Sequence, residues 1–461
     1  MSLAGILRNP PTERPTIMQR RTASQIIATA ALLTAFGAQA QDKVPYNLKP
    51  GKPYDGATIR VLFVGTPQLI GFELRSDEFT KLTGIKVTWD KTTFGALQEK
   101  VAGVGVAADG SYDVVNYLDS WGPPNARWFV PLDPLLKRDG ISMDRYPSAF
   151  VKSVTYDGKT IGLPLRSHVQ IFYYRKDIFE KLKLAAPSTW QDVVTAGQAI
   201  KKAMPEMGGL GCYYGADGNR QNLYLWLNFL RGAGTDIFDA KGNPAWDTPA
   251  GIKATKDYIA LNTVEKVCAP GSVSALEQDA RIVFMQGKVA MLPIWSWAYS
   301  PLISPESSKL TAAQVAFTGM PSYKGAPPVS LTNSMPFSIS KYSKNQEASW
   351  EFLKWLSNPE LEKKNGLEKS VNGQNTASTV FNLKSSFKDP ELNAAHAGVP
   401  IAEGIALAAN AGPLPMIVEW PEIGDLLSVA INKAAAGDGD VEQLMKNAAK
   451  EATRVLRRTR R

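Results

Sequence analysis

The chain has 461 residues, of which 44% are hydrophobic and 21% are charged. This composition excludes a disordered protein, and the length suits two or three lobes of ordinary size. The formal net charge of +9 is gathered at the two ends, because residues 1–40 hold four arginines against one glutamate and the last eight residues hold five arginines. A nucleic-acid-binding surface needs basic residues spread over one face with aromatic residues between them, so we expect no nucleic-acid partner.

Residues 1–40 are predicted to be a leader and signal peptide. The basic segment "MQRR", which begins at Met18, precedes an apolar stretch at 26–36, and small residues before Gln41 fit a cleavage site. The apolar stretch is too short to span a bilayer, and no later segment reaches eighteen apolar residues. We therefore expect a soluble periplasmic protein exported by general secretion, with twin-arginine export as the alternative route and Met1 or Met18 as the translation start.

The only two cysteines are Cys212 and Cys268. An oxidising compartment allows one disulfide between them, and two buried free thiols are the alternative. Two cysteines cannot form a zinc site by themselves.

Strands alternate with helices after the leader. The elements predicted for the first part lie, in chain order, at 57–65, 73–82, 83–90, 94–106 and 112–122, beginning and ending with strands. Such alternation implies parallel pairing in a doubly wound α/β sheet, and ligands bind beyond the carboxyl ends of its strands. Thr66 follows the first of these strands, and Asp119 and Trp121 lie in the polar loop that ends the segment at 112–122, so all three are expected near a ligand.

The alternation restarts after the run "RSHVQIFYY" at 166–174. Asp177 is predicted to cap the next helix, and Ser188 or Thr189 the one after it. Further helices are predicted at 221–231, 252–262, 276–286 and through much of 346–461, and further strands at 209–215, 287–300 and near Val315 and Ile339.

The strands near Val315 and Ile339 are predicted to join the first half of the chain. The chain then crosses between two lobes several times, which makes a hinged clamshell. The predicted N-terminal lobe is 42–167 plus 314–340, and the predicted C-terminal lobe is 168–313 plus 341–461 with a helical end.

No motif of a known catalytic site is present. The two histidines, His168 and His396, are far apart, and the sequence has no H-E-x-x-H zinc motif, nucleophile elbow, P-loop or G-x-G-x-x-G fingerprint. We therefore predict a binding protein that is not an enzyme and needs no cofactor or metal. If the protein is an enzyme after all, the alternative is a glycoside hydrolase that uses a pair of carboxylates.

The adjacent Tyr173 and Tyr174 raise the alternative of a ferric-ion site, because phenolate oxygens ligate iron in exported iron binders. Successive strand residues point to opposite faces, which favours one tyrosine in the core and one in a cleft.

The segment "PIWSWAYS" at 293–300 holds Trp295, Trp297 and Tyr299 at every second position. In an extended chain the three rings share one face, which is suited to stacking on the apolar side of a sugar ring. A stripe of core residues is the alternative.

Six segments together resemble the extracellular solute-binding proteins of carbohydrate-importing ABC transporters, the family that includes maltose-binding protein. They include "FTKLTGIKV", "YDVVNYLDSWG", "IGLPLRSHVQIFYYRKD" and "FMQGKVAMLPIWSWAY", and they lie at 79–87, 112–136, 157–193, 284–299, 338–360 and 430–456. The resemblance implies a periplasmic-binding-protein-like clamshell of two doubly wound α/β lobes joined by a multi-strand hinge. It also implies a monomer that captures a sugar, oligosaccharide or polyol and delivers it to the permease subunits of an ABC transporter.

The resemblance also implies ligand-binding positions. They are Asp119, Ser120 or Trp121 after the "YDVV" strand, Arg166, His168 or Gln170 after "IGLP", Trp226 in a helix, Trp297 as a stacking platform with Tyr299 beside it, and Trp420. Arg166 is unusual for the family at the hinge, and it leaves a sugar acid, a phosphorylated ligand or another small anion open.

Overall fold

The computed structural model describes residues 45–459. The predicted leader, cleavage site and translation start lie outside the described residues, as do Arg460 and Arg461. Within the described range, no helix has both the length and the apolar character needed to cross a membrane.

A four-stranded sheet forms the first layer, with the strand order β11-β3-β1-β2. β1 pairs in parallel with both β2 and β3, whereas β11 joins β3 in the antiparallel direction. The predicted alternation of strands and helices is therefore confirmed for this part. Its strands and connecting helices are β1 (Thr58–Val64), α1 (Pro67–Leu74), α2 (Ser76–Thr83), β2 (Lys86–Thr92), α3 (Phe94–Ala107), β3 (Val114–Asn116) and β11 (Phe337–Ile339).

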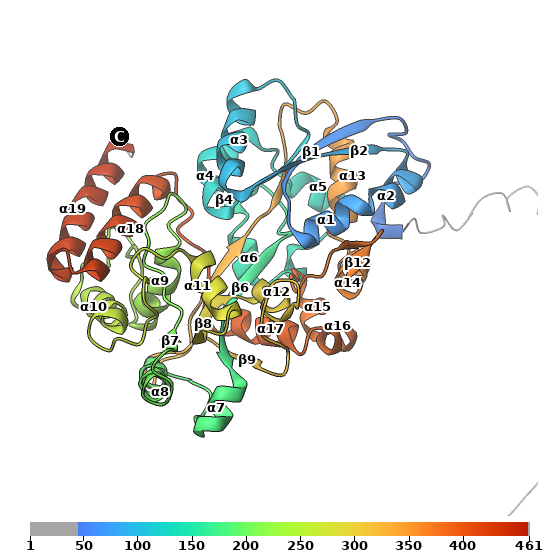
Figure 1. Ribbon diagram of the computed structural model, residues 1–461. Helices are drawn as coiled ribbons and strands as arrows, with labels where there is room; N and C mark the ends of the chain where they lie inside the picture. The colour runs from blue at the N-terminus through green and yellow to red at the C-terminus, as the bar shows by residue number, and fades with distance from the viewer. Residues whose placement is uncertain (1–44, 460–461) are drawn as a thin grey trace, which may run out of the picture. The chain divides into compact units, whose positions relative to one another are not determined.

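Helix α13 (Gln346–Leu356) packs on this first sheet through aromatic side chains. The ring centroid of Phe352 lies 5.3 Å from that of Phe79 and 5.5 Å from that of Trp89. Figure 1 shows α13, in orange, beside β1 and β2. The predicted inclusion of all of 341–461 in the C-terminal lobe does not hold for α13, because its aromatic face is buried against the first sheet.

A six-stranded sheet forms the second layer, in the order β14-β10-β6-β8-β7 with β9 also paired to β6. The long central strand β6 is antiparallel to β10 at its start and to β8 and β9 further along. Val315 pairs with Arg175 of β6, so the prediction that the strand near Val315 joins the first half of the chain is wrong. Ile339 pairs with Val114 of the first sheet, as predicted for the strand near Ile339. The strands are β6 (Ser167–Arg175), β7 (Gly208–Leu210), β8 (Val289–Trp295), β9 (Val315–Thr318), β10 (Ser330–Ser334) and β14 (Ala411–Gly412).

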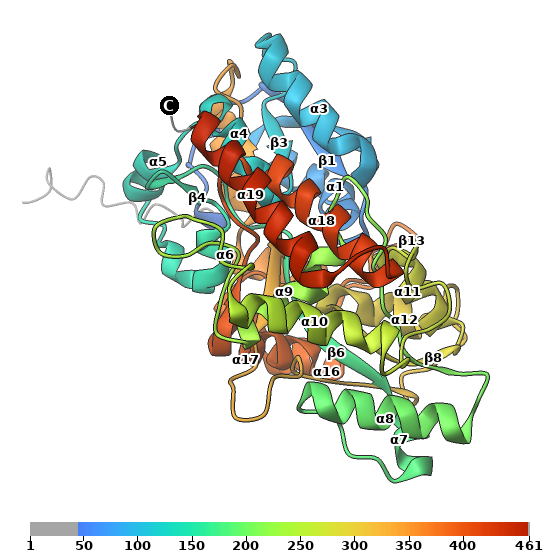
Figure 2. The ribbon, with the colours of Figure 1, turned by 90° about the vertical axis from the view of Figure 1, so that its left-hand side faces the viewer.

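Helices pack around this second sheet. The two last helices, α18 and α19, run side by side in both ribbon views (Figure 2). α9 packs against α10 and α18, and α17 packs against β6. The helices are α7 (Lys176–Leu182), α8 (Trp190–Ala203), α9 (Asn222–Gly232), α10 (Pro249–Thr263), α11 (Glu277–Met285), α12 (Tyr299–Ile303), α17 (Val399–Asn410), α18 (Trp420–Ala436) and α19 (Val441–Thr459).

The remaining described elements are short connections. They are α4 (Gly122–Asn125), α5 (Asp133–Arg138), α6 (Ser148–Lys152), β4 (Thr155–Tyr156), β5 (Lys159–Thr160), α14 (Pro359–Leu367), β12 (Ser370–Val371), β13 (Gln374–Asn375), α15 (Lys384–Lys388) and α16 (Pro390–Ala395), with 3-10 turns at Pro45–Asn47, Asp119–Trp121, Ala126–Trp128, Met143–Arg145 and Ser296–Ala298.

Two helix starts test the predicted capping signals. Thr189 caps α8 by accepting a hydrogen bond from the Asp192 amide, while the Asp192 carboxylate accepts one from the Thr189 amide. This reciprocal pair satisfies two amides that a helix start leaves free, so the prediction for α8 is confirmed. The prediction for Asp177 is wrong, because Asp177 lies inside the first turn of α7 and forms an ion pair with Arg175 at the cap position.

The chain passes between the two sheets along adjacent segments. The Met335 amide donates to the Arg166 carbonyl at 2.7 Å, and Leu163 and Phe337 form an antiparallel bridge. A third segment joins them, because the Asn382 side chain donates to the Leu165 carbonyl and accepts from the Ser167 amide. These backbone and side-chain bonds fix the start of β6 between the two sheets.

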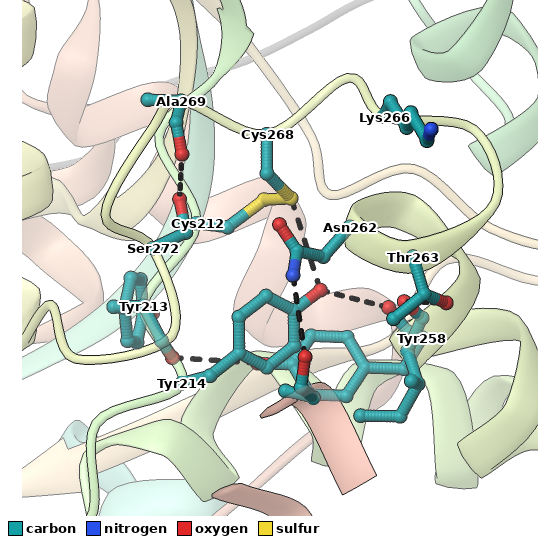
Figure 3. Close-up of a disulfide and its surroundings, with 12 residues drawn as sticks. Cys212, Tyr213, Tyr214, Tyr258, Asn262, Thr263, Lys266, Cys268, Ala269 and Ser272 are labelled. Atoms are coloured by element: carbon teal, nitrogen blue, oxygen red, sulfur yellow. Dashed lines mark hydrogen bonds between the residues drawn. A yellow bond between two sulfur atoms is a disulfide. The ribbon is translucent and has the colours of Figure 1, made fainter. Parts of the chain in front are cut away.

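The two cysteines form a disulfide, which decides between the two alternatives left by the sequence. Cys212 follows β7 and Cys268 follows α10, with their Cα atoms 5.4 Å apart. Figure 3 shows the bridge above the ring of Tyr214, whose hydroxyl donates to the Tyr258 carbonyl at 2.9 Å. The bridge thus joins the sheet to the loop that leaves α10.

Replacing both cysteines with serine is expected to lower the free energy of unfolding by about 2–4 kcal/mol, because the bridge restricts the unfolded chain. Urea denaturation followed by tryptophan fluorescence measures the change. A reducing agent should lower the denaturation midpoint of the native chain and leave that of the double variant unmoved. Equal midpoints for both proteins without reductant would contradict the prediction.

Candidate functional site

A cavity of about 190 Å³ lies where elements of the two sheets meet. The first sheet contributes the end of β1 and the start of α3, and the second contributes the starts of β6, α9 and α11 and the ends of β8 and β10. The cavity therefore lies beyond strand ends, as expected for an α/β fold. Its lining residues are Val64, Thr66, Phe94, Arg166, His168, Gln221, Tyr224, Glu277, Trp295, Trp297, Asn333 and Met335.

Alternation along the start of β6 directs side chains into the cavity. Arg166 and His168 line it, whereas Ser167 between them shares a 2.6 Å hydroxyl hydrogen bond with Ser334. Neighbouring strand residues point to opposite faces. The polar residues in this otherwise apolar run thus serve a cavity wall on one face and an inter-strand contact on the other.

Arg166 is the main positive charge of the cavity. Its Nε donates to the Thr66 hydroxyl at 3.2 Å, and its Nη1 lies 3.1 Å from the Met335 sulfur. Burial lowers the pKa of Arg166 to about 10, and the carboxylate of Glu277 acts in the opposite direction. The guanidinium is therefore charged at neutral pH.

Glu277 supplies the negative charge. The indole Nε1 of Trp295 donates to its carboxylate at 2.6 Å, and the Glu277 amide donates to the Gln221 side chain at 3.1 Å. Burial raises the pKa of Glu277 to about 7, while the Trp295 hydrogen bond and nearby arginines partly oppose this rise. Its carboxyl group therefore changes charge close to neutral pH.

His168 is held beside the same tryptophan. Its ring lies edge-on to Trp295 with centroids 5.0 Å apart. Burial, together with the charge of Arg166, lowers the pKa of His168 well below its usual range. The ring is therefore neutral, and its Nδ1 has no hydrogen-bond partner among the described residues.

A second cavity of about 290 Å³ shares part of its lining with the first. Thr66, Arg166 and Trp297 line both. The guanidinium of Arg281 lies 5.3 Å from the Trp297 ring centroid and covers one of its faces. The second cavity adds small polar side chains, including Ser300, Ser304, Ser307 and Asn375.

Four of the predicted ligand-binding residues meet at the first cavity. They are Thr66, Arg166, His168 and Trp297. Of the three residues predicted from strand-end position, only Thr66 lines this cavity, whereas Arg166, His168 and Trp297 were implied by the family resemblance.

Asp119 and Trp121 do not line the cavity. The Asp119 carboxylate accepts hydrogen bonds from the Ser334 and Ser120 amides, and burial raises its pKa to about 7. Asp119 therefore ties the loop after β3 to the end of β10. Trp121 packs against the lining residue Phe94, with the two ring centroids 5.7 Å apart.

Trp226, Tyr299 and Trp420 are also buried away from the lining. The Trp226 indole donates to the Thr255 hydroxyl at 3.0 Å, and Trp420 is buried at the start of α18. The predicted extended stripe of Trp295, Trp297 and Tyr299 is wrong, because β8 ends at Trp295 and the chain turns into a 3-10 turn and then α12. Trp295 and Trp297 line the cavity, whereas Tyr299 does not.

The two tyrosines considered for iron have separate environments. The Tyr173 hydroxyl is buried and donates to the Ser296 carbonyl at 2.9 Å. Tyr174 packs against Phe179 with centroids 4.8 Å apart. Among residues 45–459, no group of three or more His, Cys, Asp or Glu side chains has an arrangement suited to a metal ion.

The sequence did not indicate Glu277, Gln221, Tyr224, Asn333 or Met335 as site residues. Glu277 and Gln221 stand at helix starts, which is a position typical of ligand contacts, but so do many other polar residues. Asn333 and Met335 lie at the second crossing between the sheets, and a sequence alone does not reveal which late strand lies beside the hinge.

Comparisons with known proteins agree with this architecture. Residues 68–363 match the family model of the bacterial extracellular solute-binding protein. A probable amino-acid ABC transporter periplasmic-binding protein of Sinorhizobium fredii is 24% identical over 435 residues, which cover 91% of this chain and 94% of that protein.

Solved structures share the fold. A solute-binding protein of Agrobacterium radiobacter K84 in complex with ribitol has a TM-score of 0.73 at 24% identity, covering 87% of this chain and 100% of that one. Maltose-bound MalE3 of T. maritima has a TM-score of 0.74 at 22% identity, covering 86% and 99%. The likeness confirms the predicted two-lobed α/β clamshell fold.

In the variant Glu277→Gln, the free energy of unfolding is expected to fall less steeply with rising pH than in the native chain. The carboxyl has a pKa of about 7 in the folded protein and about 4.3 in the unfolded chain. Between these values the folded state holds a proton that the unfolded state releases, so the stability contributed by this group is present below the window and is lost as pH rises through it. Glutamine keeps an acceptor for the Trp295 indole and does not titrate.

Thermal unfolding of both proteins from pH 4 to pH 8 measures the effect. The variant should gain unfolding free energy relative to the native chain by at most about 1.4 kcal/mol per pH unit across the window. Glu206→Gln, at an exposed position, controls for the loss of one carboxylate. Parallel pH profiles for Glu277→Gln and the native chain would show that the group does not titrate there.

Proposed function

Since the chain belongs to the family of bacterial extracellular solute-binding proteins, we propose that it is the substrate-binding component of an ABC importer for a sugar, oligosaccharide or polyol. It binds the ligand outside the inner membrane, in the periplasm, and delivers it unchanged to the permease subunits. The observation that carries this proposal is the mixed lining of the first cavity.

That lining combines aromatic faces with fixed polar groups. Phe94, Tyr224, Trp295 and Trp297 supply the rings. Flat rings pack against the C–H side of a sugar or polyol, and convergent polar side chains fix the orientation of a ligand. Gln221, Glu277 and Asn333 supply amide and carboxyl oxygens and nitrogens for hydroxyl groups.

The ligands named for similar proteins support a polyhydroxylated compound. The solute-binding protein of A. radiobacter K84 was solved with ribitol, and the protein of T. maritima with maltose. A mannitol-binding protein of Pseudomonas aeruginosa is 26% identical over 51% of this chain and 52% of its own length.

An amino acid is the second candidate. The relative from S. fredii is named for amino-acid transport, and Arg166 and Glu277 of the cavity carry the two charges that a zwitterion requires. The four aromatic residues of the lining favour the polyhydroxylated ligand.

Ligand capture follows from the origin of the lining residues. Thr66 and Phe94 come from the first sheet and its helices, whereas Glu277 and Trp297 come from the second. A ligand that contacts both groups favours the closed arrangement of the lobes by its difference in affinity for the two states. In the proposed division, β11 and α13 belong to the N-terminal lobe and β9 and β10 to the C-terminal lobe.

The mature chain is expected to melt at a higher temperature when it binds its ligand, because only the folded state binds the ligand. It is also expected to become more compact, because the ligand favours the closed arrangement of the lobes. Thermal unfolding and small-angle X-ray scattering with panels of polyols, sugars and amino acids measure both effects. Native mass spectrometry of freshly purified protein identifies a ligand that purifies with it. A response to amino acids alone would overturn the proposed ligand class, and release of reducing ends from oligosaccharides would overturn the non-enzymatic role.

The variant Trp297→Ala is expected to weaken binding of the responding ligand by about 1–3 kcal/mol, the range seen for aromatic stacking platforms. Trp297→Phe keeps a ring on the same position and should lose less. Isothermal titration calorimetry gives both values. Equal affinity in the native chain and in Trp297→Ala would remove this side chain from the site.

A further inference from the structure

Arg166 differs from the other buried arginines of the described chain. Arg75 forms an ion pair with Glu368, Arg175 with Asp177 at 2.6 Å and Arg220 with Asp425 at 2.9 Å. For Arg166, which is 9% exposed, no carboxylate oxygen among residues 45–459 lies within 4 Å. Burying an unpaired charge costs free energy. An anion that is not part of the chain would therefore stabilise this guanidinium.

The protein groups that contact Arg166 do not meet this need. A guanidinium has five N–H donors, and the protein supplies one hydroxyl and one sulfur to them. The Thr66 hydroxyl is neutral, and the thioether sulfur of Met335 is a weak acceptor. The remaining donors belong to a side chain that lines both cavities.

Glu277 acts on Arg166 only at a distance. The two side chains line the same cavity, and their charges influence each other, but they form no ion pair. The carboxylate of Glu277 is instead held by the Trp295 indole at 2.6 Å. The cavity thus keeps its positive and negative groups apart, on different parts of its wall.

His168 lines the same cavity as Arg166. It is 3% exposed, lines the cavity two residues from Arg166, and its Nδ1 has no partner among the described residues. Buried polar atoms are normally hydrogen-bonded. His168 is therefore a second residue of the lining whose hydrogen bonds are incomplete within the described chain.

We propose that the ligand is a sugar acid, an aldonate or a uronate, whose carboxylate forms an ion pair with Arg166 and whose hydroxyls bond to Glu277, Gln221 and Asn333. This inference rests on the proposed function and specifies its ligand class. Arg166 is the residue that distinguishes the acid from the corresponding neutral sugar or polyol, because a planar guanidinium matches the two oxygens of a carboxylate.

Calorimetry with matched pairs tests the proposal on the mature chain. The pairs are D-mannitol with D-mannonate, ribitol with D-ribonate, D-glucose with D-glucuronate and D-galactose with D-galacturonate. Sugar phosphates and amino acids form two further arms. At least one acid should bind about 30-fold more tightly than its neutral partner, the effect of one buried charge pair.

The variant Arg166→Gln should lose about 30-fold or more of its affinity for that acid and only a few-fold for the neutral partner. Arg457→Gln removes an exposed arginine of α19 and should leave both affinities unchanged. Arg166→Met should unfold in the absence of ligand at no lower temperature than the native chain, because it removes an unpaired buried charge. A purely structural arginine would lower that temperature instead.

The outcomes separate the inference from the proposed function. Tight binding of neutral sugars or polyols with no gain for the acids would overturn the sugar-acid ligand and leave the proposed function standing. Binding of sugar phosphates alone would overturn the inference that the anionic group of the ligand is a carboxylate. Binding of amino acids alone would overturn both. An acid that binds Arg166→Gln as well as it binds the native chain would also overturn the inference.

Discussion

The site depends on the antiparallel contact between two crossing segments, at 163–167 and 334–337. The hydrogen bond from the Met335 amide to the Arg166 carbonyl and the bridge between Leu163 and Phe337 join them. Both segments continue into strands of the second sheet on one side and contact the first sheet on the other. Because the backbone is fixed there, alternation along β6 decides which side chains reach the cavity.

Buried polar groups of the described chain differ in how fully they are hydrogen-bonded. Glu362 is buried, but its two carboxylate oxygens accept hydrogen bonds from Asn382, the Leu383 amide and Ser386. Buried carboxylates that are satisfied in this way hold the chain together. Arg166 and the Nδ1 atom of His168 lack comparable partners in the described chain, and both belong to the cavity lining.

Local sequence patterns predicted local structure well. An apolar run predicted the strand β1, and helical spacing predicted the helix α3. Thr189 predicted the start of α8, where it pairs with Asp192. These features depend on residues a few positions apart, so a sequence pattern can indicate them. The period-two reading of "PIWSWAYS" failed because β8 ends at Trp295, where the chain leaves the sheet. Nothing in the spacing of the aromatic residues marks that end.

The sequence by itself determined the alternating strands and helices of an α/β chain, because these patterns depend on residues a few positions apart. It also indicated Thr66 by its place after a strand, and Arg166 and His168 through the family resemblance, and these three side chains line one cavity. Only the tertiary structure decided which distant residues complete the lining of that cavity. Glu277 and Asn333 join Arg166 through helix and strand packing across more than a hundred positions of the chain, whereas Asp119, Trp226 and Trp420 are taken up by buried contacts. Long-range packing sets both results, and no short stretch of sequence encodes it.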